Sequence, residues 1–341
     1  MDRAVPIDVA DRTLSAAEPR REESLAVAEN LVRGGADAER VLQAARIFAL
    51  EGRRDRAIEV LRQGILAHPR HVALLTLLGD LLSRAGSFEE AEIYVRRAVE
   101  QGPQDPEAWF RRGQHAGRQG RGDEARDAYE ETVRLEPGRV RGWVNLGLAR
   151  ADSGDRPGAI AALERAVNVD PGCGEAHSNL GVLYYETGMR AEAIAQFRRA
   201  VALAPDSSEA HFNLGWALLA EHDLEASEAM LQASVRLDPA NVESLYALAL
   251  LHLRVGQYGR AVVDLKQAIE HRPDDARLHY QLGVAYNKQD AADQAILALE
   301  TAARLHPDDP RVHHLLGVVF DKKELPARAR EAYRRAAALN G

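Results

Sequence analysis

The hydrophobic and polar positions of this chain repeat with a period of 34 residues. We number the positions of each 34-residue unit as places 1–34. Apolar or small residues occupy places 4, 7, 8 and 11, and again places 20, 24 and 27. Both groups follow the spacing of one face of an amphipathic helix. Each unit is therefore predicted to form two helices whose apolar faces pack together.

Prolines mark the ends of the units. Each of the first eight units has a proline at place 32, where a ring without an amide hydrogen ends the second helix. These prolines are Pro69, Pro103, Pro137, Pro171, Pro205, Pro239, Pro273 and Pro307. Residues 38–341 therefore divide into nine units, the last of them two places short: 38–71, 72–105, 106–139, 140–173, 174–207, 208–241, 242–275, 276–309 and 310–341.

Small residues recur where two helices would touch. Place 8 is glycine in seven units and alanine, Ala45 and Ala249, in the other two. Place 20 is alanine in every unit except one, where Ser227 stands. Between the two helices, place 15 is glycine in six units, which suits a left-handed helix cap. The pattern predicts close helix–helix contact at place 8.

The motif W/H-x-N-L-G-x-x-Y, followed by Gly, Ala, an aromatic or Leu, Ala and Pro at fixed offsets, resembles the tetratricopeptide repeat (TPR). The resemblance covers residues 38–341 and implies an all-α, right-handed solenoid of nine antiparallel helix pairs. Arg112, Arg150 and His252 depart from the pattern because they occupy apolar or aromatic places. The first unit departs from it as well, with small residues at several places. These departures affect the expected local packing and not the expected fold.

The two ends of the chain differ from the repeats. Residues 1–20 are polar, contain Pro6 and Pro19, and are predicted to be a disordered tail. Residues 21–37 are predicted to hold a helix, REESLAVAENLVRG, that covers the open end of the first unit. The chain stops within the second helix of the ninth unit, so a homodimer through the C-terminal end is one hypothesis.

Composition narrows the choice of partner. The net charge is −8, with 52 acidic and 44 basic residues, which argues against nucleic acid. No secretion signal and no run of about eighteen apolar residues is present, so we expect a cytoplasmic protein without membrane insertion. The abundance of alanine and arginine is typical of a bacterial source.

Candidate chemistry is sparse. The motifs of phosphate loops, zinc proteases, serine hydrolases and dinucleotide sites are missing. Four of the twelve histidines stand at place 4, where Trp109 and Trp143 stand in other units, and we interpret them as packing residues. We therefore expect no catalytic residues, no metal and no cofactor.

The first helix of each unit has a second face, formed by places 2, 6, 9 and 13, that points away from the apolar stripe. The TPR resemblance implies that this face lines an inner groove. Asn145, Asn179 and Asn213 all stand at place 6. They are similar to the asparagine ladder in the TPR region of O-linked N-acetylglucosamine transferase, whose catalytic domain is missing here. Such amides either bind a peptide backbone or bond a neighbouring helix.

An apolar strip and a set of basic residues share this face. From the fourth unit on, place 9 is apolar and includes Trp216, with Tyr246 and Tyr280 beside it at place 5. The strip is either buried between successive first helices or a partner site, with Trp216 as the candidate hot spot. The last three units hold five cations on this face against one acid, Glu243: Arg254, Arg277, Lys288, Arg311 and Lys322. These cations either orient a polar ligand or are ordinary solvated charges.

These patterns predict a non-catalytic scaffold that binds an extended peptide or a partner helix in the groove. The alternative is a regulatory or substrate-recruiting subunit of an enzyme complex, of the envelope-polysaccharide or pilus-assembly type.

Overall fold

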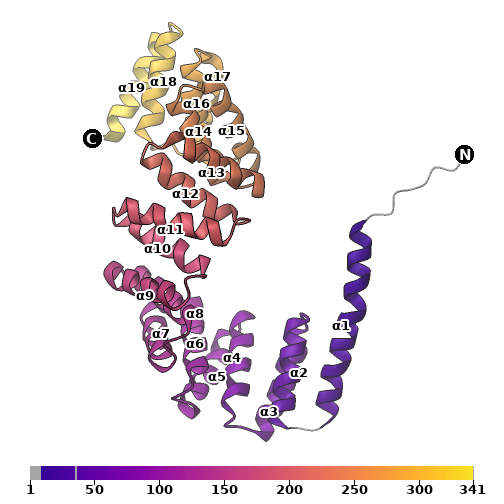
Figure 1. The fold of residues 1–341 in the computed structure, drawn as a ribbon. Coiled ribbons are helices and arrows are strands. Elements are labelled where there is room, and N and C mark those ends of the chain that lie inside the picture. Colours follow the sequence, from indigo (N-terminus) through magenta and orange to yellow (C-terminus); the bar gives the residue numbers. More distant parts are fainter. Residues whose placement is uncertain (1–8, 35–36, 341) are drawn as a thin grey trace, which may run out of the picture. The chain divides into compact units, whose positions relative to one another are not determined.

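The computed structural model describes residues 9–34 and 37–340, with side chains from Arg21 onward. Within these ranges the chain forms helices and no strand (Figure 1). The helices are α1 (Val9–Arg33), α2 (Ala38–Leu50), α3 (Arg54–Ala67), α4 (Val72–Arg84), α5 (Phe88–Gln101), α6 (Pro106–Arg118), α7 (Gly122–Leu135), α8 (Val140–Asp152), α9 (Arg156–Val169), α10 (Gly174–Glu186), α11 (Arg190–Leu203), α12 (Ser208–Ala220), α13 (Leu224–Leu237), α14 (Val242–Arg254), α15 (Tyr258–His271), α16 (Ala276–Lys288), α17 (Ala292–Leu305), α18 (Pro310–Lys322) and α19 (Pro326–Asn340).

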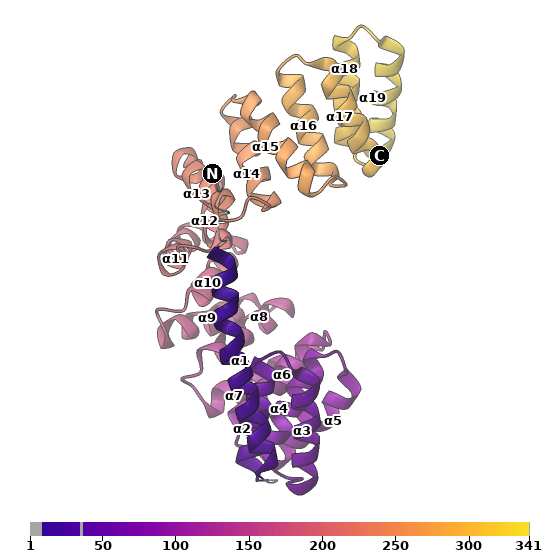
Figure 2. The ribbon, with the colours of Figure 1, turned by 90° about the vertical axis from the view of Figure 1, so that its right-hand side faces the viewer.

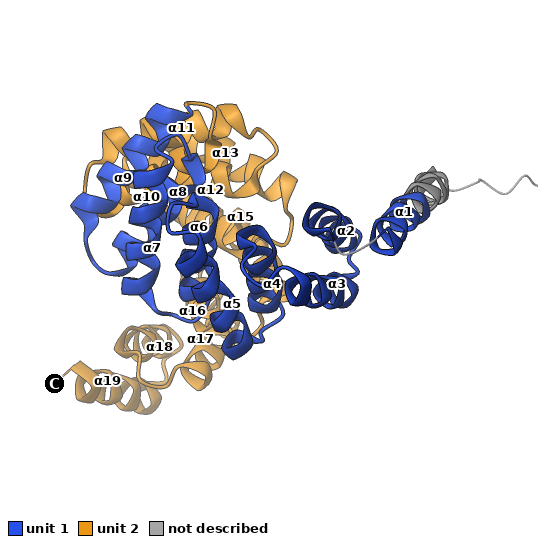
Figure 3. Ribbon diagram, turned by 90° about the horizontal axis from the view of Figure 1, so that it is seen from below, with its two compact units in different colours: residues 1–170 blue, residues 171–341 orange. Residues whose placement is uncertain are grey.

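From α2 on, the helices form successive pairs, and the first helix of every pair begins at place 1 of an expected unit (Figure 2). The all-α architecture of tandem helix pairs is confirmed. The chain divides into two compact units, unit 1 (Met1–Asp170) and unit 2 (Pro171–Gly341), which Figure 3 shows in blue and orange. The right-handed course of the array stays a prediction, because it depends on how the two units follow one another.

Glycine at place 8 allows the two helices of a pair to touch. A Cβ atom added to Gly113 would lie 2.5 Å from Cε1 of Tyr129, and one added to Gly181 would lie 2.6 Å from Cε1 of Phe197. Carbon atoms normally pack about 3.5–4.0 Å apart, so even a methyl group would not fit without movement. The large residue at place 24 therefore packs directly on the backbone at place 8, as the small residues predict.

The turn between the two helices has the same backbone form in every pair. Place 15 has a positive φ in all nine units, with glycine in six of them. The other three are His222, Asp290 and Glu324, with φ of 64°, 57° and 56°. A left-handed conformation costs a residue with a Cβ atom about 1–2 kcal/mol, so these three positions are strained. The tertiary fold imposes the turn even where the sequence lacks glycine.

The aromatic residue at place 4 is joined to the preceding proline turn. The indole nitrogen of Trp109 donates a hydrogen bond to the carbonyl oxygen of Pro103, at 3.0 Å. Histidine repeats this contact: Nε2 of His279 lies 2.8 Å from the carbonyl oxygen of Pro273. His177, His313 and Trp143 make the same bond to the proline at the end of the preceding unit. This geometry supports the interpretation that these histidines replace a packing aromatic residue, because they reproduce both its ring and its donor.

Polar partners accommodate the charged departures from the repeat. Arg112 lies over the ring of Trp109, with its guanidinium carbon 5.7 Å from the ring centre. Arg150 donates to Glu130 at 2.8 Å and to the carbonyl oxygen of Gly158 at 3.2 Å. The guanidinium groups of both arginines therefore have a partner, as partly buried charges require.

The N-terminal helix is longer than the sequence predicts. Helix α1 begins at Val9 and not at residue 21, so residues 9–20 belong to a helix and not to the expected disordered tail. This segment contains three alanines and two arginines, which are strong helix formers, and they outweigh Pro19. Ala28 is buried against the first helix pair, as a covering helix requires. Residues 1–8 lie outside the described residues, and the homodimer through the C-terminal end stays a prediction.

Candidate functional site

The first helices of unit 2 form one continuous face, since α10 contacts α12, α12 contacts α14, α14 contacts α16, and α16 contacts α18. We call the side chains at places 2, 5, 6, 9 and 13 of these helices the unit 2 face. Its apolar residues Trp216, Tyr246 and Tyr280 are half-buried, while Val182 is 37% exposed. The apolar strip is thus neither wholly buried nor wholly open. Trp216 and Tyr246 pack against buried residues of neighbouring helices and remain partly exposed.

Two arginines lie over two tyrosines on this face. The guanidinium carbon of Arg277 is 5.4 Å from the ring centre of Tyr246, and that of Arg311 is 5.4 Å from the ring centre of Tyr280. In both cases the arginine at place 2 of one repeat unit lies over the tyrosine at place 5 of the preceding repeat unit. A cation over an aromatic face is attracted by the ring quadrupole. Each stack therefore also holds together the first helices of two neighbouring repeat units.

Aspartates hold these arginines in place. Asp275 and Asp309 are the N-caps of α16 and α18, and each accepts a backbone hydrogen bond at its helix start. Their carboxylates also lie 2.8 Å from Arg277 and 2.7 Å from Arg311. Hydrogen bonds from these arginines lower the pKa of both aspartates. Glu243 makes a further ion pair with Arg277, at 3.1 Å.

This arrangement changes the interpretation of the basic residues. Their charges are opposed by Asp275 and Asp309 as well as by Glu243. A pocket of about 220 Å³ is lined by both arginines, both tyrosines and a few neighbours, among them Gln281. The two aspartates precede the first helices and lie outside places 2, 6, 9 and 13, so the pattern of the first-helix face does not indicate them. The signal was present, since DAR and DPR place an N-cap aspartate two residues before each arginine.

The other three cations do not join this pocket. Arg254, Lys288 and Lys322 stand at place 13, at the opposite end of their helices from Arg277 and Arg311. Arg254 donates to the carbonyl oxygen of Leu219 at 3.0 Å, and Lys322 pairs with Asp290 at 3.0 Å. Lys288 is exposed and has no ion pair with any residue that the structure describes.

The three asparagines have different surroundings. The amide nitrogen of Asn213 donates to the hydroxyl oxygen of Ser178 on α10, at 3.4 Å, so this residue does bond a neighbouring helix. Asn179 is half-buried and has no hydrogen-bond partner among the described side chains. Asn145 belongs to unit 1, where it lines a separate pocket. A ladder of three rungs on one surface therefore stays a prediction.

Unit 1 contains a Ser–His–Glu cluster that resembles a catalytic arrangement. Nδ1 of His115 lies 3.0 Å from Oγ of Ser83, and its Nε2 lies 3.1 Å from Oε2 of Glu92. Burial lowers the pKa of His115, and the nearby Glu92 only partly offsets this effect. Ser83 is only 2% exposed, so a substrate could not reach its hydroxyl. The cluster joins α4, α5 and α6, and its geometry is that of a structural link.

The repeated helix pairs, with glycine packed on a large residue and a proline turn between pairs, define a TPR solenoid. Residues 42–106, 96–140 and 110–155 match the family model described as tetratricopeptide repeat. Residues 137–341, more than half of the chain, match the model described as cilia and flagella-associated protein 70 C-terminal domain. The chain belongs to this family of TPR domains.

Among curated proteins, none matches the chain. Among solved structures, a tetratricopeptide repeat protein from Parabacteroides merdae is 17% identical, with 69% of this chain and 93% of that chain covered and a TM-score of 0.54. The APC/C hetero-tetramer Cut9–Hcn1 contains a chain that is 13% identical, with coverage of 96% and 92% and a TM-score of 0.51. YrrB, a TPR protein with an unusual peptide-binding site, is 20% identical, with coverage of 56% and 98% and a TM-score of 0.49. The first two likenesses establish the fold alone.

No helix within the described part of the chain is both long enough and apolar enough to cross a membrane.

Proposed function

We propose that this protein is a non-catalytic scaffold that binds an extended peptide or a partner helix on the unit 2 face. The observation that carries the proposal is the pair of arginine–tyrosine stacks around the pocket of about 220 Å³. Half-buried aromatic rings offer a partner apolar surface at a low entropy cost, because they are already ordered. This preorganisation favours recognition of a peptide over mere solvation of isolated charges.

The arginines retain hydrogen-bonding capacity for a ligand. Arg311 uses Nε and Nη2 to bind Asp309, and its Nη1 has no partner among the described residues. Arg277 is held in the same manner by Asp275 and leaves its own Nη1 unused. A guanidinium that is fixed over a ring loses little freedom when it binds an oxygen of the ligand. The pocket is therefore expected to bind carboxylate side chains and backbone carbonyl groups of the ligand.

The proposed partner is a protein or peptide and not a nucleic acid, since the two guanidiniums are each paired with an aspartate and the net charge of the chain is −8. A cytoplasmic location, a bacterial source and the roles of Asn179, Lys288 and Trp216 stay predictions from the sequence.

Selection of peptides from a displayed random library on the full chain tests this function, with affinities measured afterwards by fluorescence anisotropy. We expect the selected peptides to be enriched in acidic residues and to bind the Arg277→Gln/Arg311→Gln double variant at least tenfold more weakly. Arg236→Gln, an exposed arginine on α13, is the matched control and should leave the affinity unchanged. Equal affinity for the double variant and the control would exclude the unit 2 face as the binding surface.

A further inference from the structure

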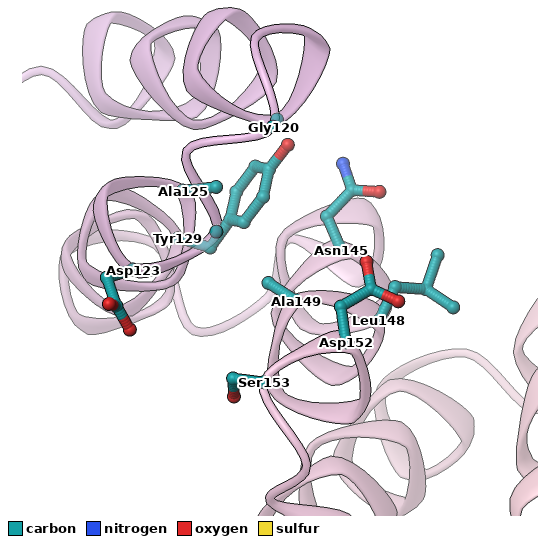
Figure 4. Close-up of a pocket in the computed structure, with 11 residues that line it drawn as sticks. Gly120, Asp123, Ala125, Tyr129, Asn145, Leu148, Ala149, Asp152 and Ser153 are labelled. Atoms are coloured by element: carbon teal, nitrogen blue, oxygen red, sulfur yellow. The ribbon is translucent and has the colours of Figure 1, made fainter.

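Unit 1 contains a larger pocket, of about 410 Å³, between the α6–α7 hairpin and α8 (Figure 4). Asn145, Leu148 and Asp152 border it from α8, and Tyr129 borders it from α7. These α8 residues stand at places 6, 9 and 13, on the first-helix face of unit 1. The pocket is thus part of the surface on which the sequence predicts ligand binding.

Missing side chains create the hollow. Gly117, Gly120 and Gly122 line the pocket, and a Cβ atom added to any of them would meet nothing within 4 Å. Gly117 and Gly122 stand at places 12 and 17, which hold larger residues in most other units, among them Leu219 and Leu253 at place 12 and Phe88 and Tyr258 at place 17. The third repeat unit is therefore the one in which both places hold glycine and no side chain fills the space.

The hydroxyl group of a buried tyrosine faces this hollow. Tyr129 is only 6% exposed, its ring packs on Gly113, and its hydroxyl points toward Gly120 on the side of the pocket where Asn145 lies (Figure 4). Within the described part of the chain this hydroxyl has no hydrogen-bond partner. Burial raises the pKa of Tyr129 to about 12, so the group is neutral at physiological pH. Although the residue as a whole is buried, its hydroxyl oxygen is accessible from the pocket, where a ligand or water can bind it.

The ninth unit shows what the third unit lacks. Tyr333 stands at the same place 24, and its hydroxyl donates to the carboxylate of Asp321 at 2.8 Å. Asp321 stands at place 12, which is Gly117 in the third unit. The chain thus closes this position with its own side chain in one unit and leaves it open in another.

The open pocket is lined by two carboxylates, Asp123 and Asp152, of which Asp123 is paired with Arg126 at 2.8 Å. Neither Asp152 nor Asn145 has an ion pair or hydrogen bond with any described residue. Arg150, two positions before Asp152, is engaged by Glu130 and by the carbonyl oxygen of Gly158. The carboxylate of Asp152 is therefore not neutralised by the chain itself.

We propose that this pocket binds a basic side chain, lysine or arginine, of a partner protein. The carboxylate of Asp152, the amide oxygen of Asn145 and the hydroxyl oxygen of Tyr129 accept hydrogen bonds from the cationic head, which is a donor only. Leu148 contacts the aliphatic stem. The inference deepens the proposed scaffold function, on which it rests for the source of the side chain, and assigns to unit 1 a preference opposite to that of unit 2.

Small probes test the pocket without any peptide. The experiment titrates Nα-acetyl-lysine methylamide into the ¹⁵N-labelled full chain, with the amides of Gly117, Gly120 and Gly122 as NMR reporters. Nα-acetyl-norleucine methylamide is the matched uncharged probe. We expect saturable shifts with the lysine probe, at least fivefold weaker binding of the norleucine probe, and weaker binding of the lysine probe as salt is raised. Equal binding of both probes, or no saturable shift with the lysine probe, would overturn the proposal.

Substitutions that the chain itself uses at equivalent places provide the variants. Tyr129→Phe copies Phe197 at place 24, and Gly117→Leu copies the leucines at place 12. We expect at least threefold weaker binding of the lysine probe to Tyr129→Phe, at least fivefold weaker binding to Asp152→Asn, and loss of binding to Gly117→Leu. Glu131→Gln, an acid of α7 paired with Arg134, is the control and should bind normally. Unchanged binding in Tyr129→Phe and Asp152→Asn would contradict the proposed site.

The two proposals fail in different ways. If the lysine probe does not bind while peptide binding depends on Arg277 and Arg311, only the unit 1 pocket is wrong. If the lysine probe binds and responds to Asp152→Asn while peptides ignore Arg277 and Arg311, only the unit 2 face is wrong.

Discussion

Replacement of the place 8 glycine by alanine tests the central packing contact of the repeat. In Gly181→Ala the new methyl carbon would lie 2.6 Å from Cε1 and 2.7 Å from Cδ1 of Phe197. Because the normal separation is about 3.5–4.0 Å, the ring or the helices must move by roughly 1 Å. Overpacking of this kind costs about 1–3 kcal/mol. Alanine also favours the helix over glycine by up to about 1 kcal/mol, which partly offsets that cost.

Gly117→Ala is the matched control, because Gly117 also lies in a helix but has nothing within 4 Å of an added Cβ atom. It should stabilise its own helix pair by at most about 1 kcal/mol. The two variants should therefore differ by about 1–3 kcal/mol in local opening free energy. Hydrogen exchange followed by mass spectrometry is the suitable assay, since repeat arrays open locally and not as a whole. The same sign and size of change in both variants would refute the packing argument.

Two further predictions concern backbone strain and pH. Glu324→Gly should stabilise α18–α19 by roughly 0.5–1 kcal/mol, because it removes left-handed strain of about 1–2 kcal/mol and adds a smaller entropy cost; a lower melting temperature would contradict this. Burial lowers the pKa of His252, but Asp264 at 2.6 Å and Glu228 raise it by more, so the net shift is upward. The contribution of His252 to stability is therefore present at low pH and lost as pH rises through the raised pKa. His115 has a lowered pKa, so its contribution is lost as pH falls, and hydrogen exchange at pH 5 and 8 should show opposite trends around the two histidines.

The repeat itself could be predicted from the sequence because each of its features has a local physical cause. Glycine at place 8 implied a close contact, and the structure places Phe197 against Gly181. Glycine at place 15 implied a positive φ, which the structure extends to positions without glycine such as Glu324. The start of α1 at Val9 could not be fixed in this way, because no repeat constrains that segment and helix propensity alone decides its length.

The candidate sites were harder to predict because they depend on contacts between units. Periodicity assigned Arg277 and Tyr246 to the correct helix face, but it did not show that one covers the other. The Tyr129 pocket was missed for a different reason. The pocket exists because Gly117 has no side chain. This is recognised only when place 12 is compared with the ninth repeat unit, where Asp321 fills the same position.

A repeat protein therefore carries its own reference for each position. Where neighbouring units agree, as at place 8, the residue serves the packing that all units share, and its replacement should change stability. Where one unit departs and the change leaves a polar group unsatisfied, packing does not explain the departure. Tyr129 meets this criterion, since Tyr333 makes with Asp321 the bond that Tyr129 lacks. By the same reasoning Arg150 does not meet it, because Glu130 of the preceding repeat unit pairs with its charge. A departure whose polar group has a partner within the chain serves the structure. A departure whose polar group has no such partner leaves a hydrogen bond that only a ligand or solvent can make.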